Sequence, residues 1–393
     1  MMIYLVLSTL LFIAGLIVIY WLHNQYHLDI IVWPVDPPSN APMVSVCIPA
    51  RNEERNIRAC VEAVLNQTYP NFEVIVVDDR SPDSTLEILE NLAKIENLRK
   101  VRFHIVRGED LPSGWAGKPH ALYQAAQAAH GDWLCFIDAD TFLAREALAS
   151  CYVKAIETNA DLFTMMTFQV TETYWERVVL PLVMTALSVG FSPRKVNDPQ
   201  RKDAIANGQF IFIKRNVYDA IGGHAGVKDQ IVEDKAISEK VKWGGYRLIV
   251  ADGMQVARTR MYTSLAELWE GWTKNIYLGL REQVGLMVLG AFGAFASVVA
   301  ALVLPFWPLL GLVWVLHGGG WIAIAIIFEA LVLWGVLIYF RAVVAHNMDI
   351  PRWYALTTPL GSAVFAAMMF TSTWKVISGQ GVTWRGRKYK PMK

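Results

Sequence analysis

Two aspartates separated by one small residue, Asp138 and Asp140, directly follow the apolar run from Trp133 to Ile137. Two carboxylates at the end of a buried strand are electrostatically costly unless a cation or hydrogen bonds compensate them. Hard oxygen donors of this type suit Mg²⁺ or Mn²⁺, which bind through one or two carboxylates and the phosphates of a ligand. We therefore predict a divalent metal site here, with a polar turn after the strand as the alternative.

A second acidic pair, Asp78 and Asp79, ends the valine-rich run from Phe72 to Val77. An acidic side chain in this position can hydrogen-bond a base or a ribose. No G-x-G-x-x-G follows either strand, which disfavours a dinucleotide-binding fold. Lys118 follows a glycine but precedes Pro119, where a P-loop needs Ser or Thr. We expect the Lys118 ammonium group to contact a diphosphate as a point charge instead.

A third acidic position, Asp234, opens a helical pattern after the glycine-rich segment Gly222–Gly226. A carboxylate there can accept a proton from an incoming hydroxyl group. An acid at a helix N-terminus is also favourable as an ordinary surface residue, because of the helix dipole. Both interpretations stay open at this level.

An aromatic cluster follows, with Trp269, Trp272 and Tyr277 placed around Lys274 and Asn275. Aromatic side chains beside a membrane segment are typical of an interfacial belt. They would serve equally well as contacts for a sugar or an acceptor.

Short apolar runs alternate with helical patterns from residue 43 to 260. Val44–Ile48 is predicted to be a strand that stops at Pro49, and Glu53–Gln67 has apolar residues at helical spacing. The further predicted strands are Phe72–Val77, Phe103–Val106 and Trp133–Ile137. Strands alternating with helices predict an α/β fold with a mainly parallel sheet covered on both faces.

Three of these strands end in polar residues, namely Pro49–Glu53, Asp78–Asp79 and Asp138–Asp140. Ligands of parallel sheets bind beyond the carboxyl ends of the strands. The polar groups are therefore expected to converge on one edge and form a site.

The composition shows that part of the chain is not in water. Of 393 residues, 54% are hydrophobic and only 18% are charged, against about 25% charged in an average soluble domain. A net charge of +1 argues against nucleic acid as the main partner, because phosphate binding needs a basic excess. None of the four cysteines forms a C-x-x-C pair, so we expect reduced, buried thiols.

Long uncharged stretches lie at both ends of the chain. Met1–Leu22 contains no charge, reaches the ~20 residues of a membrane span and lacks the basic start of a cleavable signal peptide. Val284–Phe340 contains only Glu329 as a charged residue, and Tyr354–Trp374 contains none. We predict a retained N-terminal anchor and two or four C-terminal spans.

The basic tail Lys375–Lys393 contains no acid, which favours a cytoplasmic location. The chain is then an integral protein of a plasma membrane of the bacterial type, with its catalytic domain and tail in the cytoplasm. A further apolar stretch, Val178–Phe191, is either an interfacial helix or a buried core helix. The predicted layout is an anchor at 1–22, a linker at 23–42, a catalytic domain at 43–280, a transmembrane region at 284–374 and a tail at 375–393.

Taken in order, these motifs resemble those of family 2 glycosyltransferases. The matching segments are Val44–Glu53 (VSVCIPARNE), Val76–Ser81 (VVDDRS), the pair Asp138/Asp140, and Glu233-Asp234. The resemblance covers roughly residues 43 to 280. It implies a GT-A fold with a Rossmann-like, mostly parallel sheet, an inverting reaction, a nucleotide-diphosphate sugar and a divalent cation.

The resemblance also implies roles for single residues. Pro49, Asn52, Glu53 and Asp79 would line the nucleotide pocket, Asp138 and Asp140 would hold the metal, and Asp234 would be the catalytic base. The complete set of expected substrate-binding residues is Pro49, Asn52, Glu53, Asp78, Asp79, Lys118, Glu233, Trp272 and Lys274.

Two further segments, Leu111–Lys118 and Thr383–Arg387, look like one membrane-bound branch of the family. That branch includes carotenoid, hopanoid-associated and ceramide glycosyltransferases, all of which modify lipids. Processive polysaccharide synthases carry Q-x-x-R-W, whereas the corresponding segment here is Glu270–Asn275 and lacks the Arg-Trp pair. Lys274 is the positive charge that remains there, and processive polymerisation is disfavoured.

The expected activity is transfer of one sugar from a UDP-sugar, with glucose favoured by analogy, to a lipid hydroxyl at the cytoplasmic leaflet. A polyprenyl-phosphate glycosyltransferase and a small processive polysaccharide synthase are the alternatives among enzymes. A receptor or channel subunit that binds a nucleotide sugar without turnover is disfavoured, because three separate acidic motifs would then have no catalytic role.

Overall fold

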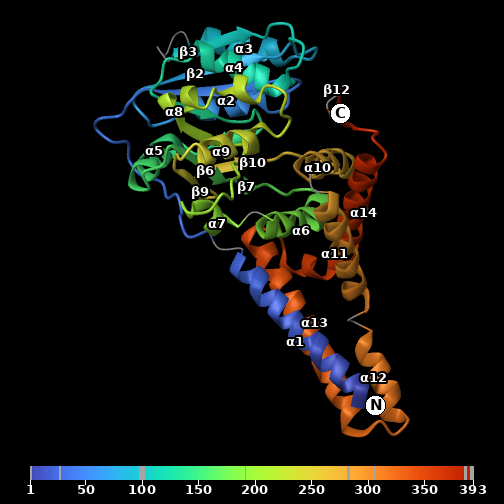
Figure 1. The fold of residues 1–393 in the computed structure, drawn as a ribbon. Coiled ribbons are helices and arrows are strands. Elements are labelled where there is room, and N and C mark those ends of the chain that lie inside the picture. Colours follow the sequence, from blue (N-terminus) through green and yellow to red (C-terminus); the bar gives the residue numbers. More distant parts are fainter. Residues whose placement is uncertain are drawn as a thin grey trace. The chain divides into compact units, whose positions relative to one another are not determined.

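A computed structural model describes residues 2–25, 28–96, 102–190, 192–280, 284–303, 306–384 and 387–389 (Figure 1). The chain divides into two compact units. The α/β unit comprises Leu28–Val170 and Phe191–Met261, and the helical unit comprises Met1–His27, Thr171–Gly190 and Tyr262–Lys393. Met1, Phe191, Pro305 and part of the basic tail belong to predicted segments but lie outside the described residues.

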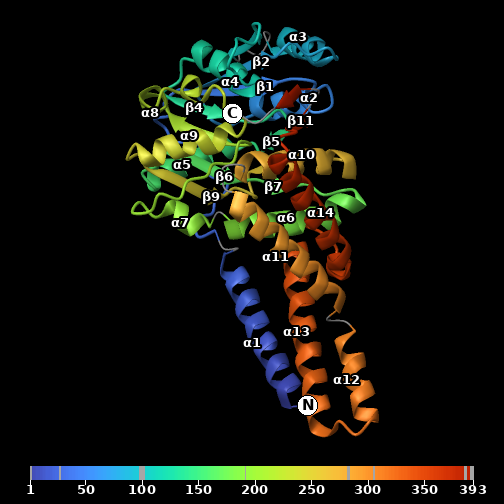
Figure 2. The same cartoon turned by 45° about the vertical axis from the view of Figure 1, so that its right-hand side comes forward.

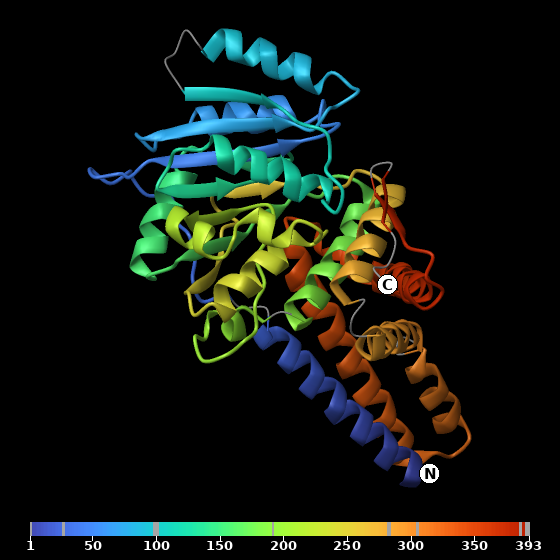
Figure 3. The ribbon, with the colours of Figure 1, turned by 45° about the horizontal axis from the view of Figure 1, so that its top comes forward.

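The α/β unit is built on a seven-stranded sheet in the order β3-β2-β1-β4-β8-β6-β9. Its strands are β1 (Val44–Ala50), β2 (Phe72–Asp78), β3 (Arg102–Arg107), β4 (Trp133–Phe136), β6 (Leu162–Met166), β8 (Ile211–Lys214) and β9 (Leu248–Asp252). All neighbouring pairs are parallel except those of β8, which runs antiparallel to β4 and β6. Figure 3 shows the strands side by side. The predicted α/β class with a mostly parallel sheet is confirmed.

Chain order reverses between β1 and β4. From β1 the chain proceeds outward to β2 and β3, whereas β4 pairs with the other edge of β1. Such a reversal opens a crevice at the carboxyl ends of the two strands, where ligands bind in sheets of this kind. The segments after β1 and β4 are the polar ones that the sequence singles out.

The prediction that β1 stops at Pro49 is wrong, because the strand continues to Ala50 with Pro49 opposite Val77 of β2. Pairing with β4 ends at Cys47, whose carbonyl accepts a hydrogen bond from the Ile137 N–H. Successive residues of a parallel strand face opposite neighbours, so Pro49 faces the side that β4 has already left. The missing N–H of proline therefore removes no bond from the ladder.

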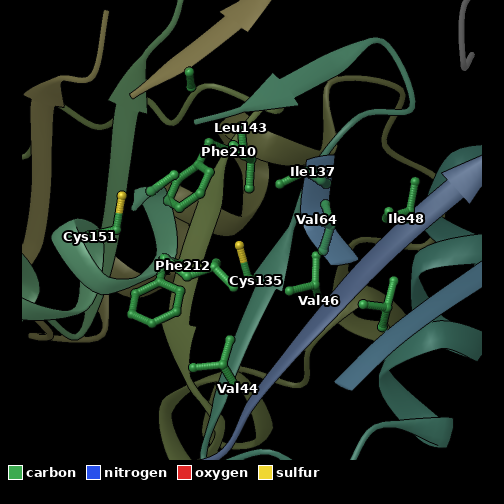
Figure 4. Close-up of a cluster of buried hydrophobic side chains, with 14 of the residues drawn as sticks. Val44, Val46, Ile48, Val64, Cys135, Ile137, Leu143, Cys151, Phe210 and Phe212 are labelled. Atoms are coloured by element: carbon green, nitrogen blue, oxygen red, sulfur yellow. The ribbon is translucent and has the colours of Figure 1, made fainter. Parts of the chain in front are cut away.

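Helices cover both faces of this sheet. One face packs on α2 (Ile57–Leu65), α3 (Thr85–Glu96) and α5 (Ala147–Glu157) through a core that Figure 4 shows around Val46, Cys135 and Phe212. The opposite face packs on α4 (Gly117–Ala128), α8 (Arg215–Ala220) and α9 (Glu233–Trp243). The alternation of strand side chains divides them between the two cores, with Val46 and Ile48 in one and Cys47 in the other.

Smaller elements complete the α/β unit. A three-stranded sheet in the order β5-β10-β7 starts directly after the Asp138–Asp140 turn. The elements are β5 (Thr141–Leu143), β7 (Phe168–Gln169), β10 (Ala257–Thr259), α7 (Pro193–Asn197) and the 3₁₀ turn η1 (His224–Val227).

All four cysteines are free and buried, as the sequence predicts. Burial raises the pKa of the Cys47 thiol and of the Cys151 thiol, so both stay protonated and behave as small apolar side chains.

The helical unit contains most of the apolar sequence. Its elements are α1 (Met2–Gln25), α6 (Tyr174–Gly190), α10 (Leu265–Leu280), α11 (Val284–Val303), α12 (Trp307–Leu316), α13 (Gly320–Asn347), η2 (Arg352–Thr357), α14 (Thr358–Ile377), β11 (Val382–Trp384) and β12 (Arg387–Tyr389). Among the described residues, Gly320–Asn347 and Arg352–Ile377 are long and apolar enough to cross a membrane. The helix predicted within Val178–Phe191 corresponds to α6, which packs against α14, with Gly361 close to the Val178 carbonyl.

A charged residue in the apolar α13 is satisfied by α1, which lies beside it (Figure 2). The hydroxyls of Ser8 and Thr9 donate to the two oxygens of Glu329, each at 2.6 Å. A carboxylate in an apolar surrounding is costly without such donors. This contact therefore fixes α1 against α13 at one register.

We expect the double substitution Ser8→Ala with Thr9→Val to lower the free energy of unfolding by about 1–2 kcal/mol, because Glu329 loses both donors. Thermal unfolding in detergent measures the loss. In a background carrying Glu329→Leu, the same double substitution should cost less, since no carboxylate then needs the donors. Thr371→Val is the control, because its hydroxyl bonds only the Ala367 carbonyl of its own helix. Equal costs in the two backgrounds would contradict the contact.

Candidate active site

The loops after β1 and β2 are held together by hydrogen bonds. The Asp79 N–H donates to the Ala50 carbonyl, and the Arg51 guanidinium donates to the Asp79 carbonyl at 2.6 Å. The Glu53 N–H donates to the Thr85 hydroxyl at 2.9 Å. Asn52 takes φ 55°, a left-handed conformation that asparagine tolerates better than most residues. The two polar strand ends therefore form one rigid rim.

Asp78 and Asp79 are both buried at this rim, with 3% and 7% of their surfaces exposed. Oδ2 of Asp78 accepts a bond from the Ser81 N–H at 3.3 Å, whereas Oδ1 is buried with no hydrogen-bond donor in the described chain. The Arg51 guanidinium lies 3.6 Å from Oδ2 of Asp79. An acceptor oxygen without a donor is unusual in a folded interior and suits the N–H of a ligand.

The Asp138–Asp140 turn joins β4 of the large sheet to β5 of the small one. Its geometry is fixed by the Thr141 N–H, which donates to the Asp138 carbonyl at 3.0 Å, and by the Cys60 thiol, which contacts the same carbonyl at 3.7 Å. Burial raises the pKa of Cys60, and the charges of Asp140, Glu53 and Asp138 raise it further. The carboxylates of Asp140, Glu53 and Asp138 therefore lie near enough to the Cys60 thiol to affect its pKa.

Lys118, in the first turn of α4, joins this group to a second one. Its Nζ lies 2.6 Å from Oδ1 of Asp138 and 2.7 Å from Oε1 of Glu233. Burial would lower the pKa of Lys118, but Asp138, Glu233 and Asp234 together outweigh burial and hold the pKa well above its usual value. The ammonium group stays charged and bridges the end of β4 to the start of α9.

Asp234 is held next to this bridge by two backbone N–H groups. Oδ1 accepts from its neighbour Lys235 at 2.7 Å and Oδ2 accepts from Gly208 at 3.0 Å. Burial, and then the charge of Glu233, raise the pKa of Asp234 to about 6, although Lys118 acts in the opposite direction. A carboxylate with a pKa close to neutrality is suited to general base catalysis.

Gly208 is a site residue that the sequence analysis misses. A Cβ at this position would lie 2.9 Å from Oδ2 of Asp234 and 3.2 Å from Nζ of Lys118. The residue precedes β8, and only the closeness of three segments in space reveals why no side chain fits. An isolated glycine before a strand gives no sequence signal for this role.

The glycine-rich segment before α9 packs around a buried histidine. His224 is 1% exposed, and its Nδ1 shares a hydrogen bond of 2.9 Å with the Tyr218 hydroxyl, which also accepts from the His224 backbone N–H at 3.1 Å. Burial, together with the charge of Lys118, lowers the pKa of His224 to about 3 and keeps it neutral. Gly223 takes φ 50°, and a Cβ there would come within 2.6 Å of the Tyr218 ring. The glycines thus serve close packing of the segment that leads to Asp234.

Most of the predicted site residues lie along the carboxyl edge of the sheet in the α/β unit, where hydrogen bonds and charges connect them. These are Asn52, Glu53, Asp78, Asp79, Lys118, Asp138, Asp140, Glu233 and Asp234, with Pro49 in β1 beneath them. Trp272 and Lys274 lie on α10 of the helical unit, where Trp272 is 6% exposed and packs near the Tyr262 ring. Their substrate contacts stay a prediction.

The carboxylates of the Asp138–Asp140 turn are the candidate ligands for a metal ion. No group of three or more His, Cys, Asp or Glu side chains suited to a metal occurs within the described ranges. Asp138 and Asp140 nevertheless supply hard oxygens at a partly exposed turn. Mg²⁺ and Mn²⁺ often take one or two carboxylates and complete their shell with phosphate oxygens and water. The residues fit a metal shared with a diphosphate.

Comparisons with known proteins agree with this geometry. Residues 45–222 match the family described as Glycosyl transferase family 2. A 4,4'-diaponeurosporenoate glycosyltransferase of Staphylococcus aureus is 27% identical over 267 residues, which cover 66% of this chain and 68% of that protein. A mannosyltransferase from Pyrobaculum calidifontis, solved with GDP-Man and Mn²⁺, superposes with a TM-score of 0.52 at 18% identity over 95% of this chain and 97% of that one. The last likeness shows the fold alone.

We expect Gly208→Ala to fold normally but to lose roughly 10-fold or more of its turnover, because the new methyl group displaces the side-chain ends of Asp234, the predicted base, and Lys118, the predicted diphosphate contact. Both side-chain ends are flexible enough to move, so the melting temperature should change little. Gly335→Ala is the matched control, since a Cβ there meets open space. Normal turnover in Gly208→Ala would show that the close approach is unimportant.

Proposed function

We propose that this chain, whose residues 45–222 match Glycosyl transferase family 2, moves one sugar from a UDP-sugar to a lipid hydroxyl at the cytoplasmic face of a membrane. The observation that carries this proposal is the Lys118 bridge, which joins Asp138 to Glu233, the residue before Asp234, at the carboxyl edge of the sheet. A base and a diphosphate site must be adjacent for direct transfer between two substrates.

In the proposed reaction, Asp234 takes the proton of the acceptor hydroxyl. The freed oxygen attacks the anomeric carbon from the face opposite the diphosphate, the new C–O bond forms, and the bond to the phosphate oxygen breaks. UDP leaves with the bonding electrons, and the sugar configuration is inverted. The Lys235 and Gly208 N–H groups hold the carboxylate of Asp234 in one orientation for this step.

The leaving diphosphate needs positive charge around it. Asp138 and Asp140 would hold a Mg²⁺ or Mn²⁺ ion, which supplies neutralisation of the diphosphate when bound. Lys118 adds a fixed cation from the side of α4. Asn52, Glu53, Asp78 and Asp79 form the proposed nucleotide pocket, and the buried Oδ1 of Asp78 is its candidate acceptor for a base N–H.

The acceptor and the location are proposed from the relative and from the helical unit. The S. aureus relative is named for transfer to 4,4'-diaponeurosporenoate, which supports a carotenoid-like lipid acceptor here. Two helices long and apolar enough to span a membrane, together with a basic C-terminal tail, support an integral membrane protein with a cytoplasmic catalytic domain. UDP-glucose is the proposed donor.

The first test is UDP release by the purified, detergent-solubilised chain over a panel of UDP-sugars with membrane lipids. We expect release with one sugar, and a loss of about 10²–10⁴-fold in Asp234→Asn, because the amide cannot accept the proton. Binding of the UDP-sugar to this variant, measured by calorimetry, should be retained.

Other results of this assay would contradict parts of the proposed function. Unchanged turnover in Asp234→Asn would remove it as the base, and activity retained only with polyprenyl phosphate would favour a phosphate acceptor. No release with any UDP-sugar, followed by release with a GDP-sugar, would overturn the UDP assignment alone.

The pH profile gives an independent test of Asp234. The base acts as a carboxylate, so protonation removes activity, and with a pKa of about 6 we expect kcat/KM to fall as the pH drops below 6 and to level off above it. The slope should approach a tenfold loss per pH unit. The residual activity of Asp234→Asn should lack this acidic limb, and a limb that persists in the variant would assign it to another group.

A further inference from the structure

We infer that Lys118 acts as a built-in counter-ion for Asp138: it occupies the metal-binding carboxylate in the free enzyme and releases it when a nucleotide diphosphate arrives. The inference rests on the proposed metal-assisted transfer and adds an order of binding to it. Divalent metal alone would bind weakly, and metal and nucleotide sugar would strengthen each other's binding.

The first support is geometric. Nζ of Lys118 lies 2.6 Å from Oδ1 of Asp138, one of the two carboxylates proposed for the metal. Oxygens at that distance from an ammonium group are its direct partners. A metal ion that used the same oxygen would place a divalent charge beside a fixed monovalent one, which is repulsive. Lys118 must therefore move or the metal must bind weakly.

The second support is that the protein alone offers an incomplete metal site. Asp138 and Asp140 are two carboxylates, and within the described ranges no cluster of three or more potential ligands exists. Two carboxylates of which one is already neutralised by Lys118 attract a metal weakly. The missing charge and oxygens must come from the diphosphate of the nucleotide sugar.

The third support is that the Lys118 side chain can move from Asp138 to a bound diphosphate. The side chain of Lys118 is 36% exposed, so part of it reaches solvent. A diphosphate bound over the same edge would offer this ammonium oxygens that carry more negative charge than one carboxylate. Glu233 remains within 2.7 Å as the second partner of Lys118, which limits how far the side chain moves. A short shift of Lys118 from Asp138 to the diphosphate then frees the Asp138 oxygen.

The test measures Mn²⁺ binding to the full chain in detergent by the electron paramagnetic resonance signal of free Mn²⁺, first without nucleotide and then with saturating UDP. For the wild type we expect UDP to tighten Mn²⁺ binding by roughly tenfold or more. For Lys118→Met we expect Mn²⁺ alone to bind roughly tenfold more tightly than to the wild type, because Asp138 has lost its competing cation.

Lys214→Met is the matched control. Lys214 pairs with Asp161 at 2.9 Å, and the side chains of that pair are 35% and 23% exposed, close to the 36% and 27% of Lys118 and Asp138. This variant removes the same charge from the α/β unit and should leave Mn²⁺ binding unchanged. Glu233→Gln is a second contrast: it leaves the ion pair of Lys118 with Asp138 in place and should not tighten Mn²⁺ binding.

The removal of Lys118 leaves Glu233 buried without its cation. The single variant is therefore assayed beside a double variant that carries both Lys118→Met and Glu233→Gln, in which Glu233 no longer contributes an unpaired buried charge. Tighter Mn²⁺ binding in this double variant supports the inference. Mn²⁺ binding that is no tighter than in the wild type, in a variant with a normal melting transition, overturns it.

The outcome also separates this inference from the proposed function. If the wild type binds Mn²⁺ with UDP and transfers sugar, but the loss of Lys118 does not tighten binding of Mn²⁺ alone, only the counter-ion role fails. If the wild type binds no Mn²⁺ in either condition, the metal-assisted part of the proposed function fails and the counter-ion role fails with it.

Discussion

The ion pairs of one lysine hold the candidate site together. Asp138 ends β4 while Glu233 and Asp234 begin α9, and these segments would repel each other without a cation between them. Lys118 bonds two of these carboxylates and lies close enough to the third to affect its pKa. Because the same lysine is the proposed diphosphate contact, the interaction that stabilises the free protein would also prepare it for the proposed substrate.

The backbone supplies the precision that this charge cluster needs. Asp234 receives N–H groups from Lys235 and Gly208, and the rim after β1 is fixed through Asp79 and Glu53. Backbone donors are held by the sheet and the helices, so they position a carboxylate more firmly than long side chains do. The position of Asp234 therefore depends on the α/β framework, and Gly208 is part of it because a Cβ there would lie 2.9 Å from Oδ2 of Asp234 and 3.2 Å from Nζ of Lys118.

The match of residues 45–222 to Glycosyl transferase family 2 and the relative that is 27% identical agree with the predicted family, and the mostly parallel α/β fold is confirmed. Both rest on local signals, namely apolar runs of strand length that end in acidic motifs. The predicted end of β1 at Pro49 is wrong, because the cost of proline depends on which neighbour its missing N–H would face. The ion pairing of Lys118 was likewise hidden: its sequence context indicates a diphosphate contact, whereas its partners come from β4 and α9.

The sequence by itself determined the identity of the chemical groups, the order of the strands and helices along the chain, and the apolar character of both ends, because composition and periodicity are local properties. Only the tertiary structure decided that Asp138, Glu233 and Lys118 meet, that Gly208 leaves room for Asp234, and that Glu329 finds Ser8 and Thr9. Each of these contacts joins residues far apart in the chain. Electrostatic and steric interactions depend on the distance between residues in space, and the separation of two residues along the sequence does not reveal that distance.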